Sequence, residues 1–467
     1  MLHIIPRSPR AAVSLAVVLT KSPPLTPKIP HSRCQVIGAR SVKQKQAGLE
    51  EILCHYGPKT PNMMVENLRF QSMSNSKWFV SAVRSASSRT PWRTGLLYYF
   101  LSRLMVFAGA GIVAAQRVIW ARGNNEPDPG SGLGLIAETL NGWDGHWYLE
   151  IIRKGYPRNI PANITYFQPE ARAAFFPVYP YLVRAVDVVL PGNQVAASLA
   201  LNFVLGAFVI LLVGMIARHL FDDKVAERTM ILMSIFPGSF ILSHAYSEAT
   251  LLVLAALCFL FLLRKNWLLA GLMAAFGTAA RPNGLALVAA CAVACLIAIK
   301  NDREWKSIIA PILAPLGYIG FMVFLRFHTG ESWAWFRVQR EAWQEGTSFG
   351  GTALTSTFEF LLHPLSSPTD MLTTASLAAL VFLAYASWKR RVPMMFNVYS
   401  LSVLFLMVLP ATVTARPRFL YTAFPLFISF AAWTRKDNDT WWPVVVAVSS
   451  VGLVVVTALS GFGTAIP

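Results

Sequence analysis

The fold is decided by a long apolar stretch near the start of the folded part of the chain. Residues 93–122 read RTGLLYYFLSRLMVFAGAGIVAAQRVIWAR, and the apolar run from 96 to 120 is long enough to cross a bilayer as a helix. Arg84, Arg89 and Arg93 precede this run. Because positive charge is retained on the cytoplasmic side of a membrane, the span should begin inside and emerge outside at Arg122. Its orientation then sets the side on which each later loop lies.

The composition of the chain is that of a membrane protein. Of 467 residues, 55% are hydrophobic and only 14% are charged, whereas soluble globular proteins carry roughly 25% charged residues. The net charge is +18, and its basic residues lie mainly in residues 1–94 and in short loops between apolar runs. Cytoplasmic loops facing anionic head groups have this bias. The charge therefore indicates membrane lipids as partners and argues against nucleic acid.

Residues 1–90 have the composition of a segment outside the folded domain. They are basic, rich in Pro, Ser and Lys, and show no sustained hydrophobic period. The apolar run from 11 to 20 resembles a signal or transit segment but is too short to span a bilayer. We expect either a disordered basic N-terminal segment or a true start downstream, at Met63, Met64 or Met73. Residues 91–467 are expected to form one multi-pass membrane domain.

We expect that domain to be an all-α polytopic membrane protein with about 11 transmembrane helices. The approximate spans are 96–120, 196–217, 229–245, 247–263, 267–280, 283–299, 307–327, 371–388, 394–411, 418–434 and 441–461. Residues 175–190 contain two prolines and two charges and make a poor span. If they lie at the outer interface, five basic loops fall inside, at 218–228, 264–265, 300–306, 389–391 and 435–436.

This topology gathers several polar elements on the outer face. The first outer loop, residues 121–173, is large and contains the stretch NGWDGHWY at 141–148. Further outer elements are 244–248, 280–284, the aromatic-rich loop 328–370, and 415–418. Aromatic faces in the loop 328–370 suit either sugar rings or a membrane interface. Asp144 and His146 are the first candidates for chemistry, because they lie two residues apart among aromatic side chains.

Asp144 is the candidate general base. A carboxylate near the membrane surface can remove the proton of a substrate hydroxyl as that hydroxyl attacks. The alternative is a cap for a helix that begins near Gly145, with Trp143 and Trp147 in an interfacial belt. His146 could orient Asp144 or contact substrate. No second His or acid lies at metal-ligand spacing, so we expect no metal and no cofactor.

Glu248 and three arginines are the other charged candidates. Glu248 begins an apolar span, where it either complements the helix dipole or takes part in function. Arg281, Arg416 and Arg418 lie outside, against the positive-inside trend, and each is beside a proline at a helix break. Their planar guanidinium groups suit a phosphate. The alternatives are ion pairs with Glu248 or Asp144, or contact with lipid phosphate.

In their order and spacing, these motifs resemble the PIG-V family of GPI mannosyltransferase II and its bacterial relatives, which are GT-C glycosyltransferases. The resemblance covers approximately residues 95–435 and is carried by Trp143-Asp144-Gly-His-Trp-Tyr, Gly155-Tyr156-Pro157, Ala174-Phe-Phe-Pro-Val-Tyr-Pro180, Tyr246-Ser247-Glu248, Ala280-Arg281-Pro-Asn283-Gly284 and Arg416-Pro-Arg418-Phe-Leu-Tyr421. It implies a GT-C-like fold with a large first extracytoplasmic loop. It also implies a mannosyltransferase that uses polyprenyl- or dolichyl-phosphate-mannose as donor and a lipid or glycan hydroxyl as acceptor.

The resemblance also assigns roles to single residues. Asp144 is the implied catalytic base, and one base with one displacement implies inversion at the anomeric carbon. The implied substrate-binding residues are Trp143, His146, Tyr246, Glu248, Arg281, Asn283, Arg416, Arg418 and Tyr421. Pro282 stands where eukaryotic members have Ser, and the Trp-Asp element is closer to the bacterial members. Both features favour the bacterial plasma membrane over the endoplasmic reticulum, with the active site on the extracytoplasmic face.

A transporter or flippase of a lipid-linked or anionic substrate is the alternative function. Transporters place polar residues near the bilayer midplane, in interrupted helices of two related halves. Here the polar elements gather at one face, and no related halves are visible. A purely structural membrane protein would leave the outer arginines unexplained.

Overall fold

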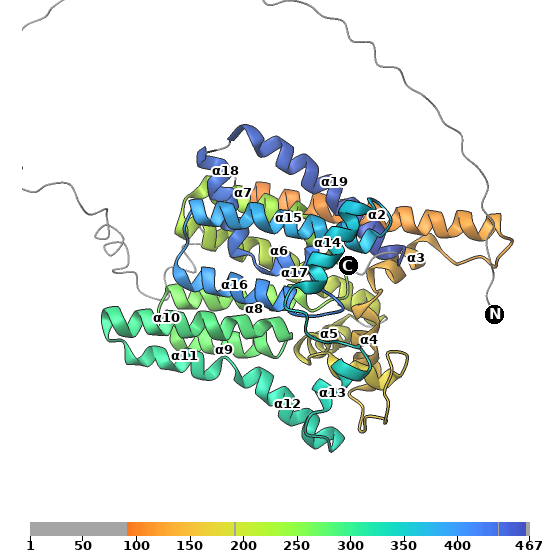
Figure 1. The fold of residues 1–467 in the computed structure, drawn as a ribbon, viewed down its shortest axis with the longest axis horizontal. Helices are drawn as coiled ribbons and strands as arrows, with labels where there is room; N and C mark the ends of the chain where they lie inside the picture. Colours follow the sequence, from red (N-terminus) through yellow and green to blue (C-terminus); the bar gives the residue numbers. More distant parts are fainter. Residues whose placement is uncertain (1–90, 191–192, 438, 464–467) are drawn as a thin grey trace, which may run out of the picture. The chain divides into compact units, whose positions relative to one another are not determined.

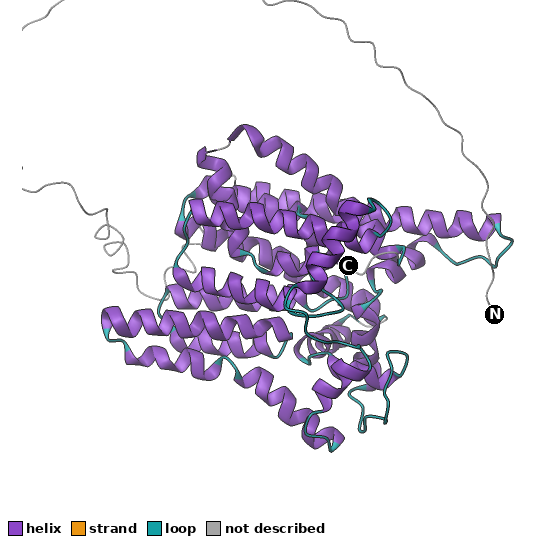
Figure 2. Ribbon diagram, in the orientation of Figure 1, coloured by secondary structure: helices purple, strands orange, loops and turns teal. Residues whose placement is uncertain are grey.

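Apolar runs separated by short polar loops fold into helices throughout the described chain. The computed structural model describes residues 91–190, 193–437 and 439–463, all within the unit Met73–Pro467. Figure 2 shows helices and loops, and within these residues there is no strand. A single bridge joins Thr347 and Pro410. The expected all-α class is confirmed, whereas the expectation for residues 1–90 lies outside the described residues.

The helices are joined mainly by short connections, and Figure 1 shows many of them lying roughly along one direction. In chain order they are α2 (Pro91–Gly123), α3 (Gly132–Leu140), α4 (Asp144–Lys154), α5 (Val178–Val189), α6 (Gln194–Leu220), α7 (Asp223–Ile235), α8 (Glu248–Leu263), α9 (Trp267–Thr278), α10 (Ala286–Asp302), α11 (Ile309–Leu313), α12 (Leu316–Thr329), α13 (Ala334–Glu341), α14 (Gly351–Leu362), α15 (Pro368–Lys389), α16 (Met394–Val408), α17 (Pro417–Thr422), α18 (Pro425–Asp437) and α19 (Trp442–Gly461). The 3-10 helices are η2 (Pro169–Ala174), η3 (Pro237–Ser243), η4 (Pro282–Leu285), η5 (Trp305–Ile308) and η6 (Asp439–Trp441).

Six helical segments in the described chain are long and apolar enough to cross a membrane, or up to seven if the bent pair α7–η3 is one span. The six are Pro91–Gly123, Gln194–Leu220, Pro282–Asp302, Trp305–Thr329, Pro368–Lys389 and Asp439–Gly461. The chain is thus an integral, multi-pass membrane protein. The apolar helices α8, α9 and α16 are shorter, and the 12 residues of α9 rise only about 18 Å against a hydrocarbon core of about 30 Å. The expected count of eleven spans stays a prediction.

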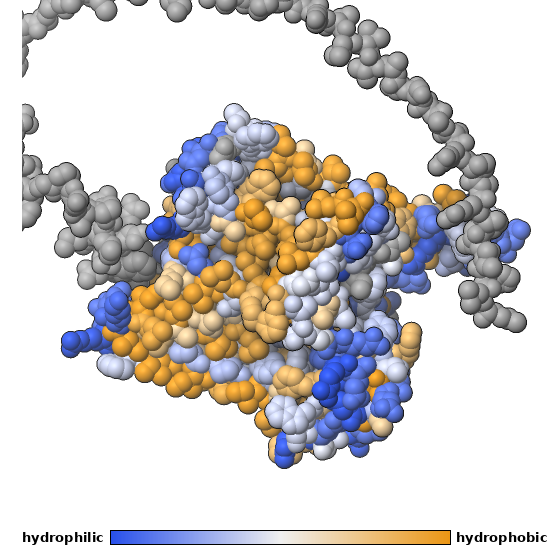
Figure 3. Space-filling view, in the orientation of Figure 1, coloured by the Kyte–Doolittle hydropathy of each residue, from blue (hydrophilic) through white to orange (hydrophobic). Residues whose placement is uncertain are grey.

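The loops that the topology places inside meet one another in the structure. Lys265 after α8 pairs with Asp302 at the end of α10 at 2.7 Å, and Arg390 after α15 pairs with Asp437 at the end of α18 at 2.6 Å. On the face drawn in Figure 3, apolar residues cover the middle of the helical body and hydrophilic residues gather toward its two ends. The helix α5 has only 12 residues and is not among the candidate spans, and the interfacial position of 175–190 stays a prediction.

The chain bends sharply between α7 and η3, just before the loop that leads to α8. The two helices are bent by 74°, and Pro237 at the start of η3 cannot donate the hydrogen bond that would continue α7. The buried guanidinium of Arg103 in α2 donates to the backbone oxygens of Ser234 and Ser239, at 3.1 and 2.8 Å. Because these bonds satisfy carbonyl groups freed by the bend, the bend is stable inside the protein.

Candidate active site

The Trp143-Asp144 element lies in a turn between α3 and α4. Trp143 has φ 56°, a left-handed conformation that costs an L-residue about 1–3 kcal/mol. Its indole Nε1 donates to the backbone oxygen of Ser460, near the end of α19, at 3.0 Å. The backbone N–H of Ala245 donates to the oxygen of Leu140 at 3.0 Å. The turn is thereby held from two sides, and Asp144 becomes the first residue of α4.

The loop between η3 and α8 is buried and tied to its surroundings by side chains. The amide of Asn202 in α6 donates to the backbone oxygens of His244 and Tyr246. The hydroxyls of Ser247 and Tyr148 lie 2.6 Å apart. Burial raises the pKa of the Tyr148 hydroxyl above its ordinary value, so this group stays protonated and can take part in the bond. Together these bonds place the start of α8 beside α4.

A close backbone contact positions α17 against η3. A Cβ atom at Gly238 would lie 2.2 Å from the backbone oxygen of Pro417, so any larger residue would force the two segments apart. Tyr421, one turn further along α17, donates its hydroxyl to the backbone oxygen of Met233 at 2.6 Å. With α17 fixed in this way, Arg418 reaches the starts of α4 and α8.

Four of the sequence-predicted residues meet at this junction and form what we call the four-charge cluster: Asp144, Glu248, Arg281 and Arg418. Arg418 Nη1 lies 2.8 Å from Asp144 Oδ2 and 3.9 Å from Glu248 Oε1. Arg281 Nη1 lies 2.8 Å from Glu248 Oε2 and 3.8 Å from Asp144 Oδ2. The short contact between Arg281 and Glu248 is an ion pair without hydrogen-bond geometry. Two carboxylates thus balance two guanidinium groups, as buried charges require.

The two carboxylates of the cluster differ in access. The side chain of Glu248 is completely buried, whereas that of Asp144 is 14% exposed and lines a pocket. Arg418 donates to Oδ2 of Asp144, while Oδ1 accepts no hydrogen bond from any residue that the structure describes. Asp144 is the first helical residue and turns its carboxylate to Arg418, so it is not the helix cap of the alternative interpretation. A fixed carboxylate with one free oxygen can accept a proton.

The pocket beside Asp144 has a volume of about 480 Å³, and its wall combines aromatic rings with polar and charged side chains, among them a second acid, Glu341. Its lining includes Trp143, Tyr166, Phe167, Trp343 and Arg418. The rings of Tyr166 and Trp343 pack edge to face with centroids 4.9 Å apart. Tyr166 and Phe167 were not among the sequence-predicted residues, although an adjacent aromatic pair in the Pro- and Asn-rich part of the first outer loop was the available signal. The loop 328–370 contributes Trp343 to the same wall.

Four other predicted residues do not line this pocket: Tyr246, Arg416, Asn283 and His146. Tyr246 is buried, with its ring centre 5.6 Å from the guanidinium carbon of Arg418. Arg416 is also buried but faces α15, where it donates to a threonine hydroxyl. Asn283 is half-buried in η4, and His146 is exposed on α4. Neither of these two is among the described residues that line the pocket.

A second, apolar groove of about 540 Å³ runs beside the cluster, between α5, α6, α8 and α9. It is lined by Val178, Leu182, Leu205, Val253, Leu254 and Phe276, with the hydroxyl of Thr250 as a polar exception. The backbone N–H of Val178 donates to the oxygen of Ala279 at 3.4 Å, two residues before Arg281. One end of the groove therefore lies close to the backbone that leads to Arg281.

These features define an integral, all-helical membrane protein with a charged, aromatic-walled pocket where several helices begin. Among residues 91–190, 193–437 and 439–463, no group of three or more His, Cys, Asp or Glu side chains is placed to hold a metal ion. No family model and no curated protein matches the sequence.

This chain is similar to several solved structures. ArnT from Cupriavidus metallidurans bound to undecaprenyl phosphate is 12% identical over 79% of this chain and 77% of that chain, with a TM-score of 0.47. The Archaeoglobus fulgidus oligosaccharyltransferase in its apo form is 13% identical over 77% of this chain and 55% of its own, with a TM-score of 0.39. The oligosaccharyltransferase AglB from the same archaeon, in complex with an inhibitory peptide and a dolichol-phosphate, is 13% identical over 68% and 51%, with a TM-score of 0.32. At these identities and TM-scores, the likenesses say nothing about the activity of this chain.

Proposed function

We propose that the chain is a membrane glycosyltransferase of the GT-C type. It transfers mannose from a polyprenyl- or dolichyl-phosphate carrier to a hydroxyl of a lipid-linked or glycan acceptor. The observation that carries the proposal is the setting of Asp144: Arg418 fixes one carboxylate oxygen at 2.8 Å, and the residue lines a pocket with an aromatic wall. Sugar transfer to a hydroxyl needs a positioned base and a surface on which a sugar ring stacks, and this site offers both.

In the proposed reaction, Asp144 accepts the proton of the acceptor hydroxyl. The acceptor oxygen forms a bond to the anomeric carbon, while the bond from that carbon to the phosphate oxygen breaks. The electron pair of the broken bond leaves with the lipid phosphate. Because the acceptor attacks opposite to the leaving group in a single displacement, the configuration at the anomeric carbon inverts.

The arginines of the four-charge cluster are the proposed partners of the donor phosphate. The recorded contacts use Nη1 of Arg281 and Nη1 of Arg418, and Nε of Arg418 is buried without a partner among the described residues. Each guanidinium carries five N–H donors, so donors remain for phosphate oxygens. Positive charge at this point would stabilise the negative charge that develops on the leaving phosphate.

The pocket and the groove match the two parts of such a donor. A volume of about 480 Å³ lies within the range of small-molecule sites, and the rings of Tyr166 and Trp343 suit the apolar face of a hexose. The apolar groove of about 540 Å³ suits an isoprenoid chain. Because one end of the groove lies near Arg281, a lipid chain there would carry its phosphate to the cluster.

The identity of the sugar, the carrier and the membrane is inferred from the sequence alone. Mannose as the sugar and the two candidate carriers follow from the resemblance to the PIG-V family. The extracytoplasmic position of the site follows from the positive-inside topology. The bacterial plasma membrane is proposed because the Trp143-Asp144 element is closer to the bacterial members.

The proposal is tested with the full-length protein purified in detergent. The protein is incubated with radiolabelled polyprenyl-phosphate-mannose and a membrane lipid extract as acceptor, and labelled products are separated by thin-layer chromatography. We expect label to move from donor to a new lipid or glycan product. The same assay is repeated with dolichyl-phosphate-mannose, and no transfer by the wild type from either carrier would contradict the proposal. Movement of the intact donor across reconstituted vesicles without any transfer would instead support the transporter alternative.

A further inference from the structure

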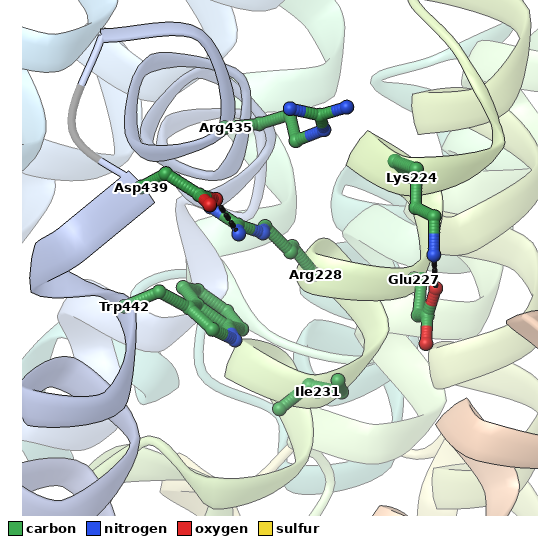
Figure 4. Close-up of a pocket in the computed structure, with 7 residues that line it drawn as sticks. All are labelled: Lys224, Glu227, Arg228, Ile231, Arg435, Asp439 and Trp442. Carbon is green, nitrogen blue, oxygen red and sulfur yellow. Dashed lines mark hydrogen bonds and ion pairs between the residues drawn. The ribbon is translucent and has the colours of Figure 1, made fainter.

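A polar pocket of about 340 Å³ lies where α7, α18 and η6 meet (Figure 4). In Figure 4, Lys224 and Glu227 of α7 lie on one side, Asp439 and Trp442 lie on the other, and Arg228 is between them. Ile231 and Arg435 complete the lining. No role in the proposed sugar transfer uses any of these residues.

This pocket lies a membrane thickness away from the four-charge cluster. Trp442 is the first residue of α19, and Ser460 near the end of the same helix accepts the hydrogen bond from Trp143. The 20 residues of α19 rise about 30 Å. The pocket is therefore at the end of the helical body that the basic loops place inside the cell.

The charges of the pocket leave a cation and a buried donor unused. Lys224 lies 3.4 Å from Glu227, and Arg228 is paired with Asp439. Arg435 makes no ion pair with any residue in the described ranges, and Nη1 of Arg228 is buried without a hydrogen-bond partner there. Three basic side chains against two acidic ones give the pocket a net charge of +1. An anion would satisfy both the free cation and the buried donor.

The surroundings of the pocket are those of a lipid rather than of a soluble anion. The indole of Trp442 lies under the guanidinium of Arg228, with 4.7 Å between the guanidinium carbon and the ring centre. The pocket lies at the cytoplasmic ends of the helices, the level at which basic pockets of membrane proteins meet the head groups of anionic lipids.

We propose that this pocket binds the phosphate of an anionic phospholipid from the inner leaflet. The phosphate oxygens accept hydrogen bonds from Arg435 and from Nη1 of Arg228, and the acyl chains extend from the pocket toward the bilayer core. The site is independent of the proposed sugar transfer, because it shares no residue with the four-charge cluster or its pocket.

Native mass spectrometry of the full-length protein in detergent measures the binding. The probes are phosphatidylglycerol, phosphatidylcholine and inorganic phosphate, each titrated separately. We expect the wild type to bind phosphatidylglycerol about tenfold more tightly than phosphatidylcholine, and Arg435→Gln to lose about tenfold in affinity for phosphatidylglycerol, because a hydrogen bond to a charged group is removed. Lys436→Gln is the matched control, because it removes the same charge from the next exposed residue, which does not line the pocket.

The outcomes separate a specific lipid site from general surface charge. Arg435→Lys should keep most of the affinity, because the cation is retained. An equal loss in Arg435→Gln and Lys436→Gln would mean that only surface charge matters, and this result overturns the proposal. Binding of inorganic phosphate as tightly as phosphatidylglycerol overturns the lipid as occupant. Arg435 is exposed, so unfolding should not obscure the comparison, and thermal unfolding of each variant verifies this.

Discussion

Replacing Asp144 with Asn tests whether its carboxylate is a base or only a member of an ion-pair cluster. The change keeps the shape of the side chain and removes its charge. Asp144 loses attraction to Arg418 at 2.8 Å and to Arg281 at 3.8 Å. At an effective dielectric constant of about 20, Coulomb's law assigns roughly 6 kcal/mol to the shorter contact and roughly 4 kcal/mol to the longer one, before desolvation is counted.

The net loss of stability should be smaller than these attractions, because the ions also regain hydration when they separate. Breaking a buried pair by removing one partner typically costs about 3–5 kcal/mol. We expect a value near the lower limit, about 3 kcal/mol, because Asp144 is 14% exposed and Glu248 still faces Arg418 at 3.9 Å. Transfer activity should fall by about 100-fold or more, since a positioned base contributes about 10²–10⁴-fold.

Glu248→Gln is the matched control for this prediction. Glu248 lies 2.8 Å from Arg281 and 3.9 Å from Arg418, so its replacement breaks one short and one longer contact, as Asp144→Asn does. Both variants leave the cluster with one uncompensated positive charge. Glu248 is completely buried and is not among the described residues that line the pocket, so its replacement removes no candidate base. We expect Glu248→Gln to lower stability at least as much, but to keep transfer within about tenfold of the wild type.

The assay follows radiolabelled mannose from its polyprenyl-phosphate carrier to product, and thermal unfolding in detergent is measured on the same samples. The reasoning is refuted if Asp144→Asn transfers mannose within tenfold of the wild type. It is also refuted if Asp144→Asn and Glu248→Gln lose the same activity at the same loss of stability. In that second case, the charge balance of the cluster, and not a base, would explain the loss.

Three further predictions concern the arginine, the sugar pocket and the contact that positions α17. Arg418→Lys keeps the charge but loses the planar fork, so the KM for the lipid-phosphate donor should rise by about tenfold; an unchanged KM would argue against a phosphate contact. Tyr166→Ala removes a half-exposed ring from the pocket, so transfer should fall by about three- to tenfold while the unfolding midpoint stays unaltered. The matched variant Phe167→Ala shows which of the two rings the sugar contacts. Gly238→Ala places a Cβ 2.2 Å from a backbone oxygen of α17, so thermal unfolding should show a loss of about 1–3 kcal/mol, and a variant as stable as the wild type would contradict the proposed positioning.

The fold sends two pairs of neighbouring candidate residues in different directions. Asp144 and His146 are two residues apart on α4, and Arg416 and Arg418 are two residues apart at the start of α17. Residues at this spacing do not share a helix face. Accordingly Asp144 and Arg418 meet, while His146 is exposed and Arg416 turns to α15.

The sequence by itself determined the all-helical membrane class and the set of loops that carry positive charge. These properties depend on composition and on runs of neighbouring residues, which a linear chain displays directly. The orientation of the first span, inferred from Arg84, Arg89 and Arg93, stays a prediction.

Only the tertiary structure decided which charged groups meet. Asp144 and Arg418 are 274 residues apart, and their 2.8 Å contact depends on the bend after α7, the close approach at Gly238 and the turn at Trp143. Tyr166 and Trp343 likewise form one wall from two distant loops. Such contacts arise from packing of distant segments, whose geometry no local pattern of residues encodes.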